Sequence, residues 1–432
     1  MADFARSDSP AVQAQLDRLG SPAAAADRLG LDRIRELLDR MGRPHDALPP
    51  VFHVAGTNGK GSTCAFLRAG LEAAEHRVHV FTSPHLVRFN ERIRVAGKLV
   101  SDEVLAALLE ETINAAEGLE ASFFEVATAA AMLEFARTPA DACILEVGLG
   151  GRLDATNIID CPLVCGIASL GLDHQQFLGA DIVAVAREKA AIAKPAVPLL
   201  FGDYPDEVTA AVVDVAEAAG ARPLRAFDHW HYSSADAAIH YRDAGGPLSI
   251  PKPAMQGAHQ VDNCALALAM LRHQVEVHVP LDAVMRMPLE ARWPARLQRL
   301  APGPLVDAAG GAAVWVDGGH NPSAAERVAT WLSGHHPLPT VIIGLLANKD
   351  AHGVLGPIAA TGAAIVTLPV SEHESHGPEE LALIAKAAGG RSVCSAHDLQ
   401  EAVRMVKCRD IAIVGSLYLA GEALAANGEI PD

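Results

Sequence analysis

Short apolar runs alternate with longer amphipathic segments over most of the chain, and this pattern limits the possible folds more than any other feature. In the first part of the chain, the apolar runs occupy residues 51–56, 76–84, 142–148 and 162–170. Segments with helical spacing of apolar residues lie at 62–74, 123–136 and 181–194. A buried parallel strand is apolar on both faces and needs a crossover helix to reach its neighbour. The alternation therefore predicts an α/β fold whose strand ends build the functional site.

A second alternation follows the polar, proline-containing stretch 292–304. Its strand-like runs lie at residues 312–319, 340–348, 363–370, 391–395 and 410–415, and its helix-like segments at 323–332, 378–389 and 398–408. A chain of 432 residues is too long for one ordinary core. We therefore predict an N-terminal parallel-sheet domain over residues 1–296 and a smaller C-terminal Rossmann-like α/β domain over residues 297–432. The alternation in residues 229–241 predicts that the stretch from Tyr204 to Pro253 is a small antiparallel insertion, to which the sequence assigns no function.

The chain carries 52 acidic and 35 basic residues, a formal net charge of −17. Such a charge disfavours nucleic acid and anionic membrane, so we expect neither as a partner. The N-terminal residues lack the apolar core of a signal peptide, and no window approaches the about 20 apolar residues of a membrane span. Seven irregularly spaced cysteines predict reduced core thiols rather than a disulfide framework. We expect a cytoplasmic monomer.

A glycine-rich segment follows the first apolar run, in the order Gly56, Thr57, Asn58, Gly59, Lys60, Gly61 and Ser62. Glycines let backbone N–H groups turn toward an anion, and the N-terminus of the following helix adds its dipole. Lys60 can reach the β- and γ-phosphates of a nucleotide. The spacing departs from the common GxxxxGK[ST] pattern because Gly61 follows Lys60. We predict a nucleotide-binding loop and hence a P-loop-type domain; a glycine-rich turn without a ligand is the alternative for the loop alone.

The string HVAGTNGKGST resembles the shortened phosphate loop of the Mur ligase superfamily. Within it, other segments resemble the folylpolyglutamate synthase and dihydrofolate synthase family in the expected order, from about Leu29 to Leu419. These segments are FTSPHLVRFNERI, FFEVATAAA, LEVGLGGRLDATN, LDHQQFLG, REKAAIAKP, GAHQVDNCALALA, RWPARLQ, VDGGHNP and LLANKD. The resemblance implies an ATP-dependent, Mg²⁺-requiring ligase that forms amide bonds.

The resemblance implies magnesium ligands at Ser83, Glu146 and His174. Mg²⁺ prefers oxygen ligands and takes few of them from protein. The resemblance also places Lys189 at a lysine that CO2 converts to a carbamate, whose oxygens would support a second Mg²⁺ beside His174. Lys60, Lys189 and His174 are then the expected catalytic residues. Taken alone, His174 would satisfy a backbone carbonyl and Lys189 would be a solvated helix lysine.

Beyond the phosphate loop, the resemblance implies nucleotide contacts from Asn263, Arg296, Asp317 and His320. Without the resemblance, Asn263 would be interpreted as the cap of a following helix and Asp317 as a residue that holds a turn.

For a substrate that carries a pterin ring, the resemblance implies binding by Phe124, Asp154 and Ala155. Phe124 offers a stacking surface, although taken alone it would be interpreted as a core residue. The chain departs from the family at Arg28, where an acidic residue is usual.

The implied reaction begins with phosphorylation of a substrate carboxylate by ATP, after which the amine of L-glutamate displaces phosphate. The implied substrates are L-glutamate, dihydropteroate and reduced folates, and the implied cofactors are ATP and two Mg²⁺ ions. Two alternatives stay open, namely a Mur-type ligase that extends a UDP-muramoyl peptide and a P-loop ATPase or kinase. We expect no separate N-terminal UDP-binding domain, since the phosphate loop begins at Gly56.

Overall fold

The computed structural model describes residues 5–20, 29–173, 175–179, 181–406 and 409–432. The chain forms two compact units. The first comprises Met1–Ala254, Gln260–Arg292 and Asp432, and the second comprises Met255–His259 and Trp293–Pro431. Each unit has its own sheet and its own hydrophobic core.

The main sheet of the first unit has eight strands in the order β4-β3-β2-β5-β1-β6-β7-β8. Strands β2, β5, β1, β6, β7 and β8 run parallel to one another. Strands β3 and β4 extend one edge of the sheet through antiparallel pairing. This arrangement confirms the predicted parallel sheet. Because β1 lies between β5 and β6, the chain order reverses around it, and open α/β sheets bind ligands at such a point. The strands are β1 (Val51–Ala55), β2 (Val78–Phe81), β3 (Ile93–Val95), β4 (Lys98–Leu99), β5 (Ala142–Glu146), β6 (Val164–Ile167), β7 (Pro198–Phe201) and β8 (Arg222–Arg225).

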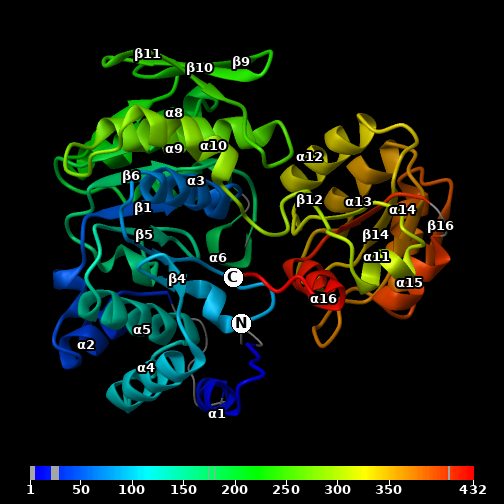
Figure 1. Cartoon of the computed structure of the whole chain (residues 1–432), viewed down its shortest axis with the longest axis horizontal. Coiled ribbons are helices and arrows are strands. Elements are labelled where there is room, and N and C mark those ends of the chain that lie inside the picture. Colours follow the sequence, from blue (N-terminus) through cyan, green and yellow to red (C-terminus); the bar gives the residue numbers. More distant parts are fainter. Residues whose placement is uncertain (1–4, 21–28, 174, 180, 407–408) are drawn as a thin grey trace. The chain divides into compact units, whose positions relative to one another are not determined.

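Helices cover both faces of this sheet (Figure 1). Helix α5 packs with α2 and α4 on one face, α7 packs with α8, and α3 packs with α10 on the other face. Short 3-10 helices connect several elements. The helical elements are α1 (Pro10–Leu19), α2 (Asp32–Arg40), η1 (Pro44–Ala47), α3 (Lys60–Ala73), η2 (Phe89–Arg92), α4 (Asp102–Ala115), α5 (Phe123–Arg137), η3 (Ala155–Ile158), α6 (Gln175–Leu178), α7 (Ile182–Ala190), α8 (Asp206–Ala218), α9 (His259–His273) and α10 (Leu281–Glu290).

A separate three-stranded sheet follows β8, with strands β9 (His231–Ala235), β10 (Ala238–Asp243) and β11 (Gly246–Pro251). All its strand pairs are antiparallel. In Figure 1 it lies beyond the helices at the top of the first unit. The antiparallel insertion predicted for residues 204–253 is thus confirmed only over residues 231–251, because residues 206–225 contain α8 and the parallel strand β8 of the main sheet.

The second unit contains a six-stranded sheet in the order β12-β13-β17-β14-β15-β16. Only β12, at one edge, pairs antiparallel among these strands. The strands are β12 (Gln298–Arg299), β13 (Val314–Val316), β14 (Thr340–Ile343), β15 (Ile365–Thr367), β16 (Val393–Ser395) and β17 (Ile411–Val414). The helices are α11 (Pro304–Ala308), α12 (Pro322–Ser333), α13 (Ala351–Ala360), α14 (Pro378–Ala387), α15 (Leu399–Met405) and α16 (Leu417–Asn427). This unit is the separate C-terminal α/β fold that the second alternation predicts.

The cysteines only partly follow the expectation of core thiols. Four described cysteines are buried, namely Cys64, Cys143, Cys165 and Cys264. Cys161 and Cys394 are exposed, because the first lies in a loop and the second on edge strand β16. The expectation is wrong for these two, and Cys408 lies outside the described residues. No helix in the described parts of the chain has the length and apolar character needed to cross a bilayer.

Candidate active site

The glycine-rich segment lies between β1 and α3, as the sequence predicts, and two of its glycines have backbone angles suited to glycine. Gly56 has a φ of 150° and Gly59 a φ of 86°. A Cβ on Gly56 would lie 2.8 Å from the Cβ of Ala168. A Cβ on Gly59 would overlap Oδ1 of Asn263, which is buried in α9. The loop therefore keeps its shape because these positions carry no side chain.

The loop is fastened to the end of β6 by backbone contacts. The N–H groups of Thr57 and Asn58 both donate to the carbonyl oxygen of Ser169, at 2.9 and 3.2 Å. The Thr57 hydroxyl donates to the Gly171 carbonyl at 2.8 Å and accepts from the Gly171 N–H at 3.2 Å. The sequence did not reveal Ser169 or Gly171 as loop partners, since a backbone acceptor leaves no side-chain signal.

The remaining residues of the predicted phosphate loop lie in the first turn of α3. Lys60 is the first residue of α3, and its Nζ lies 3.5 Å from the Thr57 carbonyl oxygen. Gly61 and Ser62 are buried behind it, and Ser62 Oγ has no hydrogen-bond partner among the residues that the structure describes. A helix N-terminus with a cation and an unsatisfied hydroxyl is suited to phosphate and to a hard metal ion. The loop can therefore bind the phosphates of a nucleotide.

Glu146 and Ser83 come together at the ends of β5 and β2. Glu146 is the last residue of β5 and is buried, and it lies opposite Val54 of β1 in the strand register. The Ser83 N–H donates to Glu146 Oε2 at 3.3 Å. The two predicted metal ligands thus lie at the ends of the neighbouring strands β2 and β5, and β5 pairs with β1, the strand that leads into the phosphate loop.

Lys189 of α7 is buried rather than solvated, with an exposed fraction of 4%. Its Nζ donates to the carbonyl oxygen of Gly56 at 3.0 Å. Burial and the nearby charge of Lys60 lower the pKa of Lys189 to about 7, although Asp173 and Asp154 act in the opposite direction. The interpretation as a surface lysine is wrong, because α7 packs this face against the phosphate loop.

Oxygen donors for a divalent cation lie on these elements. Ser62 Oγ is buried without a partner in the described part of the chain, and the Glu146 carboxylate is buried beside Ser83. These hard donors fit Mg²⁺, which takes few ligands from protein. No group of three or more His, Cys, Asp or Glu side chains gathers into a metal site within the described ranges. His174 and Arg28 lie outside the described residues.

The predicted pterin loop packs against both Phe124 and α7. A Cβ on Gly148 would lie 2.5 Å from Cζ of the Phe124 ring, and the ring is half-buried. A Cβ on Gly151 would lie 2.5 Å from the carbonyl oxygen of Glu188, next to Lys189. The loop therefore lies between the Phe124 ring and the helix that carries Lys189.

Asp154 is buried within this loop and organises it. It accepts hydrogen bonds from the Leu149 N–H at 2.8 Å, the Thr156 N–H at 3.0 Å and the Thr156 hydroxyl at 2.6 Å. Burial raises the pKa of Asp154, while these donors favour the carboxylate. Ala155 is also buried and is the first residue of η3.

His53 of β1 is a further residue of this network that the sequence did not reveal. Its Nε2 lies 2.9 Å from the Thr156 hydroxyl oxygen. Because that hydroxyl donates its proton to Asp154, Nε2 must carry the imidazole proton. Burial and the charge of Lys194 lower the pKa of His53 to about 3, so the ring is neutral. A lone histidine in an apolar strand gives no signal of such a role.

Asn263 lies in the second turn of α9 and does not cap a following helix. Its Nδ2 donates to Gln260 Oε1 at 3.1 Å, and its Oδ1 faces Gly59. The helix begins earlier than the sequence indicates, which puts Asn263 against the phosphate loop.

Arg296, Asp317 and His320 gather within the second unit. Asp317 directly follows β13. Its carboxylate accepts hydrogen bonds from the Leu297 N–H at 2.9 Å and the Gly319 N–H at 2.7 Å. Burial raises the pKa of Asp317, whereas the charge of Arg296 opposes this shift. The Arg296 guanidinium donates to the Ala295 carbonyl at 2.9 Å, and His320 Nδ1 lies 2.9 Å from the Gly318 carbonyl oxygen. Asp317 therefore holds a turn, as its interpretation without the family resemblance expected, and the charge of Arg296 acts on it.

The chain is similar in sequence to known proteins. A family model described as "Mur ligase, glutamate ligase domain" matches residues 297–414. The dihydrofolate synthase/folylpolyglutamate synthase of Escherichia coli K12 is 38% identical over 334 residues, which cover 76% of this chain and 74% of that protein.

Solved structures agree along nearly the whole chain. The structure of E. coli FolC in complex with DHPP and ADP has a TM-score of 0.85 at 32% identity, and 97% of each chain is covered. A bifunctional folylpolyglutamate synthase/dihydrofolate synthase with Mn, AMPPNP and L-glutamate bound has a TM-score of 0.84 at 30% identity, with 97% of this chain and 98% of that chain covered. The chain therefore belongs to the dihydrofolate synthase and folylpolyglutamate synthase family, whose members are ligases.

Proposed function

We propose that this enzyme uses ATP to join L-glutamate to dihydropteroate, which forms dihydrofolate, and to the glutamate tail of reduced folates. The ATP-binding part would extend over residues 1–296 and the glutamate-ligase part over residues 297–432. We also propose that the enzyme acts as a monomer in the cytoplasm.

One observation carries this proposal: a single helix, α7, contacts both the phosphate loop and the predicted pterin loop. Lys189 Nζ donates to Gly56 in the phosphate loop at 3.0 Å. One residue earlier, the Glu188 carbonyl accepts from the Arg152 N–H at 2.9 Å, and the Glu188 carboxylate accepts from the Arg152 side chain at 2.9 Å. A nucleotide and an acid substrate bound at these loops would be close enough for phosphoryl transfer.

The reaction needs an activated carboxylate, because a carboxylate has no leaving group. A carboxylate oxygen of the substrate attacks the γ-phosphorus of ATP, and the bond to the bridging oxygen breaks, so that ADP leaves. The amine of glutamate then attacks the acyl carbon, phosphate leaves with the former carboxylate oxygen, and the amine loses a proton. Lys60 and the N–H groups at the start of α3 stabilise the phosphoryl charge, so no protein nucleophile is needed.

Ser62, Ser83 and Glu146 are the described residues that would hold Mg²⁺, with His174 as the further ligand that the family resemblance implies. Bound Mg²⁺ would neutralise charge on the phosphate oxygens. Replacing Glu146 by Gln exchanges a charged ligand for a neutral one, so the Mg²⁺ concentration for half-maximal activity should rise at least about tenfold. An unchanged Mg²⁺ titration would exclude Glu146 as a ligand.

Lys189 is the proposed site of carbamylation. Its neutral amine would attack CO2 and lose one proton, which turns a buried cation into an anion. The lowered pKa of Lys189 supports this reaction, because half of the amine is neutral near pH 7. Removal of CO2 at mildly acidic pH should reduce activity until bicarbonate is added, and Lys189→Ala should be nearly inactive but partly rescued by a small carboxylate. Full activity after CO2 removal would contradict this role.

The function is tested by incubating purified protein with ATP, Mg²⁺ and glutamate, and adding dihydropteroate, tetrahydrofolate or a UDP-muramoyl peptide in separate reactions. Glutamylated products from the first two support the proposal. A product from UDP-muramoyl peptide alone would favour a Mur-type ligase, and ATP hydrolysis independent of glutamate would favour an ATPase or kinase. Lys60→Ala should abolish product formation, whereas Lys98→Ala, on exposed strand residue Lys98, should not.

A further inference from the structure

The three-stranded sheet β9–β11 has one aromatic face. Tyr232 of β9 and Tyr241 of β10 are direct cross-strand partners. The Trp230 ring stacks on both, with centroid distances of 5.7 and 6.2 Å. Trp230 and Tyr241 are each only 1% exposed, while Ser233 and His240 on the other face are exposed. The aromatic face is therefore covered by the rest of the first unit.

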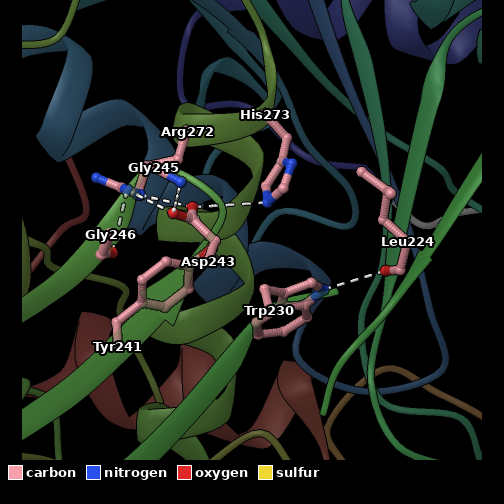
Figure 2. A network of polar contacts seen from close by, with 8 residues as sticks. All are labelled: Leu224, Trp230, Tyr241, Asp243, Gly245, Gly246, Arg272 and His273. Atoms are coloured by element: carbon pink, nitrogen blue, oxygen red, sulfur yellow. Dashed lines mark hydrogen bonds and ion pairs between the residues drawn. The ribbon is translucent and has the colours of Figure 1, made fainter. Parts of the chain in front are cut away.

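One end of this face is anchored to the last turn of α9 (Figure 2). Asp243 of β10 accepts from Arg272 Nε at 2.7 Å and from the Tyr241 hydroxyl at 3.1 Å. The Asp243 side chain is 3% exposed, and the Arg272 guanidinium also lies 5.5 Å from the Tyr241 ring centroid. A buried, bidentate ion pair with further donors fixes geometry at this end.

The other end of the face contacts the first turn of α9. The Tyr232 hydroxyl donates to Asp262 Oδ1 at 3.0 Å. Asp262 immediately precedes Asn263, whose Oδ1 faces Gly59 of the phosphate loop. Asp262 and Arg272 are ten residues apart in one helix, a separation of about 15 Å at 1.5 Å per residue. The sheet therefore holds α9 at two separate points.

Helix α9 is buried along much of its length, including Gln260 in its first turn, and two of its close apolar contacts are with glycines of neighbouring elements. A Cβ on Gly166 of β6 would meet Met270 Sδ, and a Cβ on Gly70 of α3 would lie 2.9 Å from the Leu271 side chain. Both contacts lie near the C-terminal end of the helix. Apolar packing is non-directional, whereas a hydrogen bond to a carboxylate specifies rotation and register.

We propose that the β9–β11 sheet positions α9 for nucleotide binding, with Tyr232 as the positioning residue and the Asp243–Arg272 pair as its anchor. Through Asp262, Tyr232 fixes the first turn of α9 and so holds Asn263 against Gly59. This inference rests on the proposed ATP-binding function and assigns a role to a segment outside the reacting groups. Tyr232 therefore acts on the nucleotide only through Asp262 and Asn263.

The test measures the affinity for the ATP analogue AMPPNP by calorimetry, together with KM for ATP and kcat. Tyr232→Phe removes one hydroxyl and should raise Kd and KM about threefold to tenfold, with kcat at saturating ATP changed less than twofold. Asp262→Ala should have a similar effect. Asp262→Asn should retain most of the affinity, because its amide oxygen can still accept the hydrogen bond from Tyr232. The double variant Tyr232→Phe/Asp262→Ala should bind AMPPNP no more weakly than the weaker of the two single variants.

Tyr241→Phe is the matched control, since it removes the same group from the cross-strand partner while Arg272 still holds Asp243 at the far end of the helix. It should lower the melting temperature slightly and leave KM for ATP within about twofold. Equal KM effects of Tyr232→Phe and Tyr241→Phe, unchanged KM in Tyr232→Phe, or additive effects in the double variant would each overturn the inference. Failure of the wild-type protein to bind AMPPNP would instead refute the proposed function.

Discussion

The two loops that carry the expected phosphate-binding cations are built in opposite ways. Around Lys60, the backbone turns at Gly56 and Gly59, and neighbouring atoms occupy the space that a Cβ would need. Around Arg296, the left-handed residues are Ala295 and Leu297, with φ values of 54° and 45°. The shape of the first loop requires glycine, because a side chain would collide with neighbouring atoms. The backbone of the second loop is strained at two residues with side chains, so other groups must hold it in place.

Those holding groups are identifiable in the second unit. Asp317 Oδ2 accepts from the Leu297 N–H at 2.9 Å, and Gln298 Oε1 accepts from the Ala295 N–H at 2.9 Å. Adding a side chain at Gly56 or Gly59 should therefore damage the first loop, and removing the side chains that clamp Ala295 and Leu297 should damage the second.

Gly59→Ala should have the largest effect. The new Cβ meets Asn263 at a φ of 86°, so the loop must move, and we expect kcat/KM for ATP to fall about 100-fold or more. Steady-state kinetics measure this loss. The control is Gly118→Ala, where φ is 77° and no atom of the described residues lies within 4 Å of the added Cβ. It should cost only about 1–2 kcal/mol of stability, and a comparable kinetic defect in it would show that strain alone explains the result.

Asp317→Ala should have the next largest effect, through removal of atoms. It leaves the N–H groups of Leu297 and Gly319 without their acceptor, which should cost about 2–4 kcal/mol of unfolding free energy in the second unit and lower activity about tenfold. Chemical denaturation and kinetics measure both. Asp350→Ala is the matched control, because Asp350 is exposed and caps α13 through Gly353 alone. It should cost about 1 kcal/mol. If both variants lose equal stability, Asp317 is no more than an ordinary cap.

The pH dependence should distinguish the first unit through His53. The folded-state pKa of His53 is about 3 and lies below the ordinary value of 6.5, so the unfolded chain binds more protons between these values. Stability of the first unit should therefore fall as pH falls below about 6.5, by about 2 kcal/mol at pH 5.

Hydrogen exchange of the β1 amides at pH 7 and pH 5 measures this change. His53→Gln should be less stable at pH 7 and should show a smaller loss between the two pH values. An identical loss in both proteins would assign the pH dependence to other groups.

Ala295→Gly should have the smallest effect. Glycine relieves the positive φ of 54° but increases the entropy of the unfolded chain, so stability should change by less than about 1 kcal/mol. Thermal unfolding measures it. A loss of several kcal/mol would mean that the Ala295 methyl group, not the hydrogen-bond clamp, holds this loop.

Much of the fold and part of the site could be predicted from sequence. The apolar runs at 51–56 and 142–148 gave the positions of β1 and β5, because apolar strand residues are specified by local pattern. The phosphate loop followed from its glycines and lysine. The contacts of Lys189 could not be predicted in this way, since its burial depends on which face of α7 meets a loop more than 130 residues earlier.

The sequence by itself determined the order of the elements, the loop that turns on glycine and the chemical types of the site residues, because these depend on neighbouring residues. Only the tertiary structure decided that Asn263 lies against Gly59, that His53 reaches Asp154 through Thr156, and that the β9–β11 sheet holds both ends of α9. These contacts join segments far apart in the chain. Their distances and burial, and the resulting pKa values, exist only once the sheets and helices have packed.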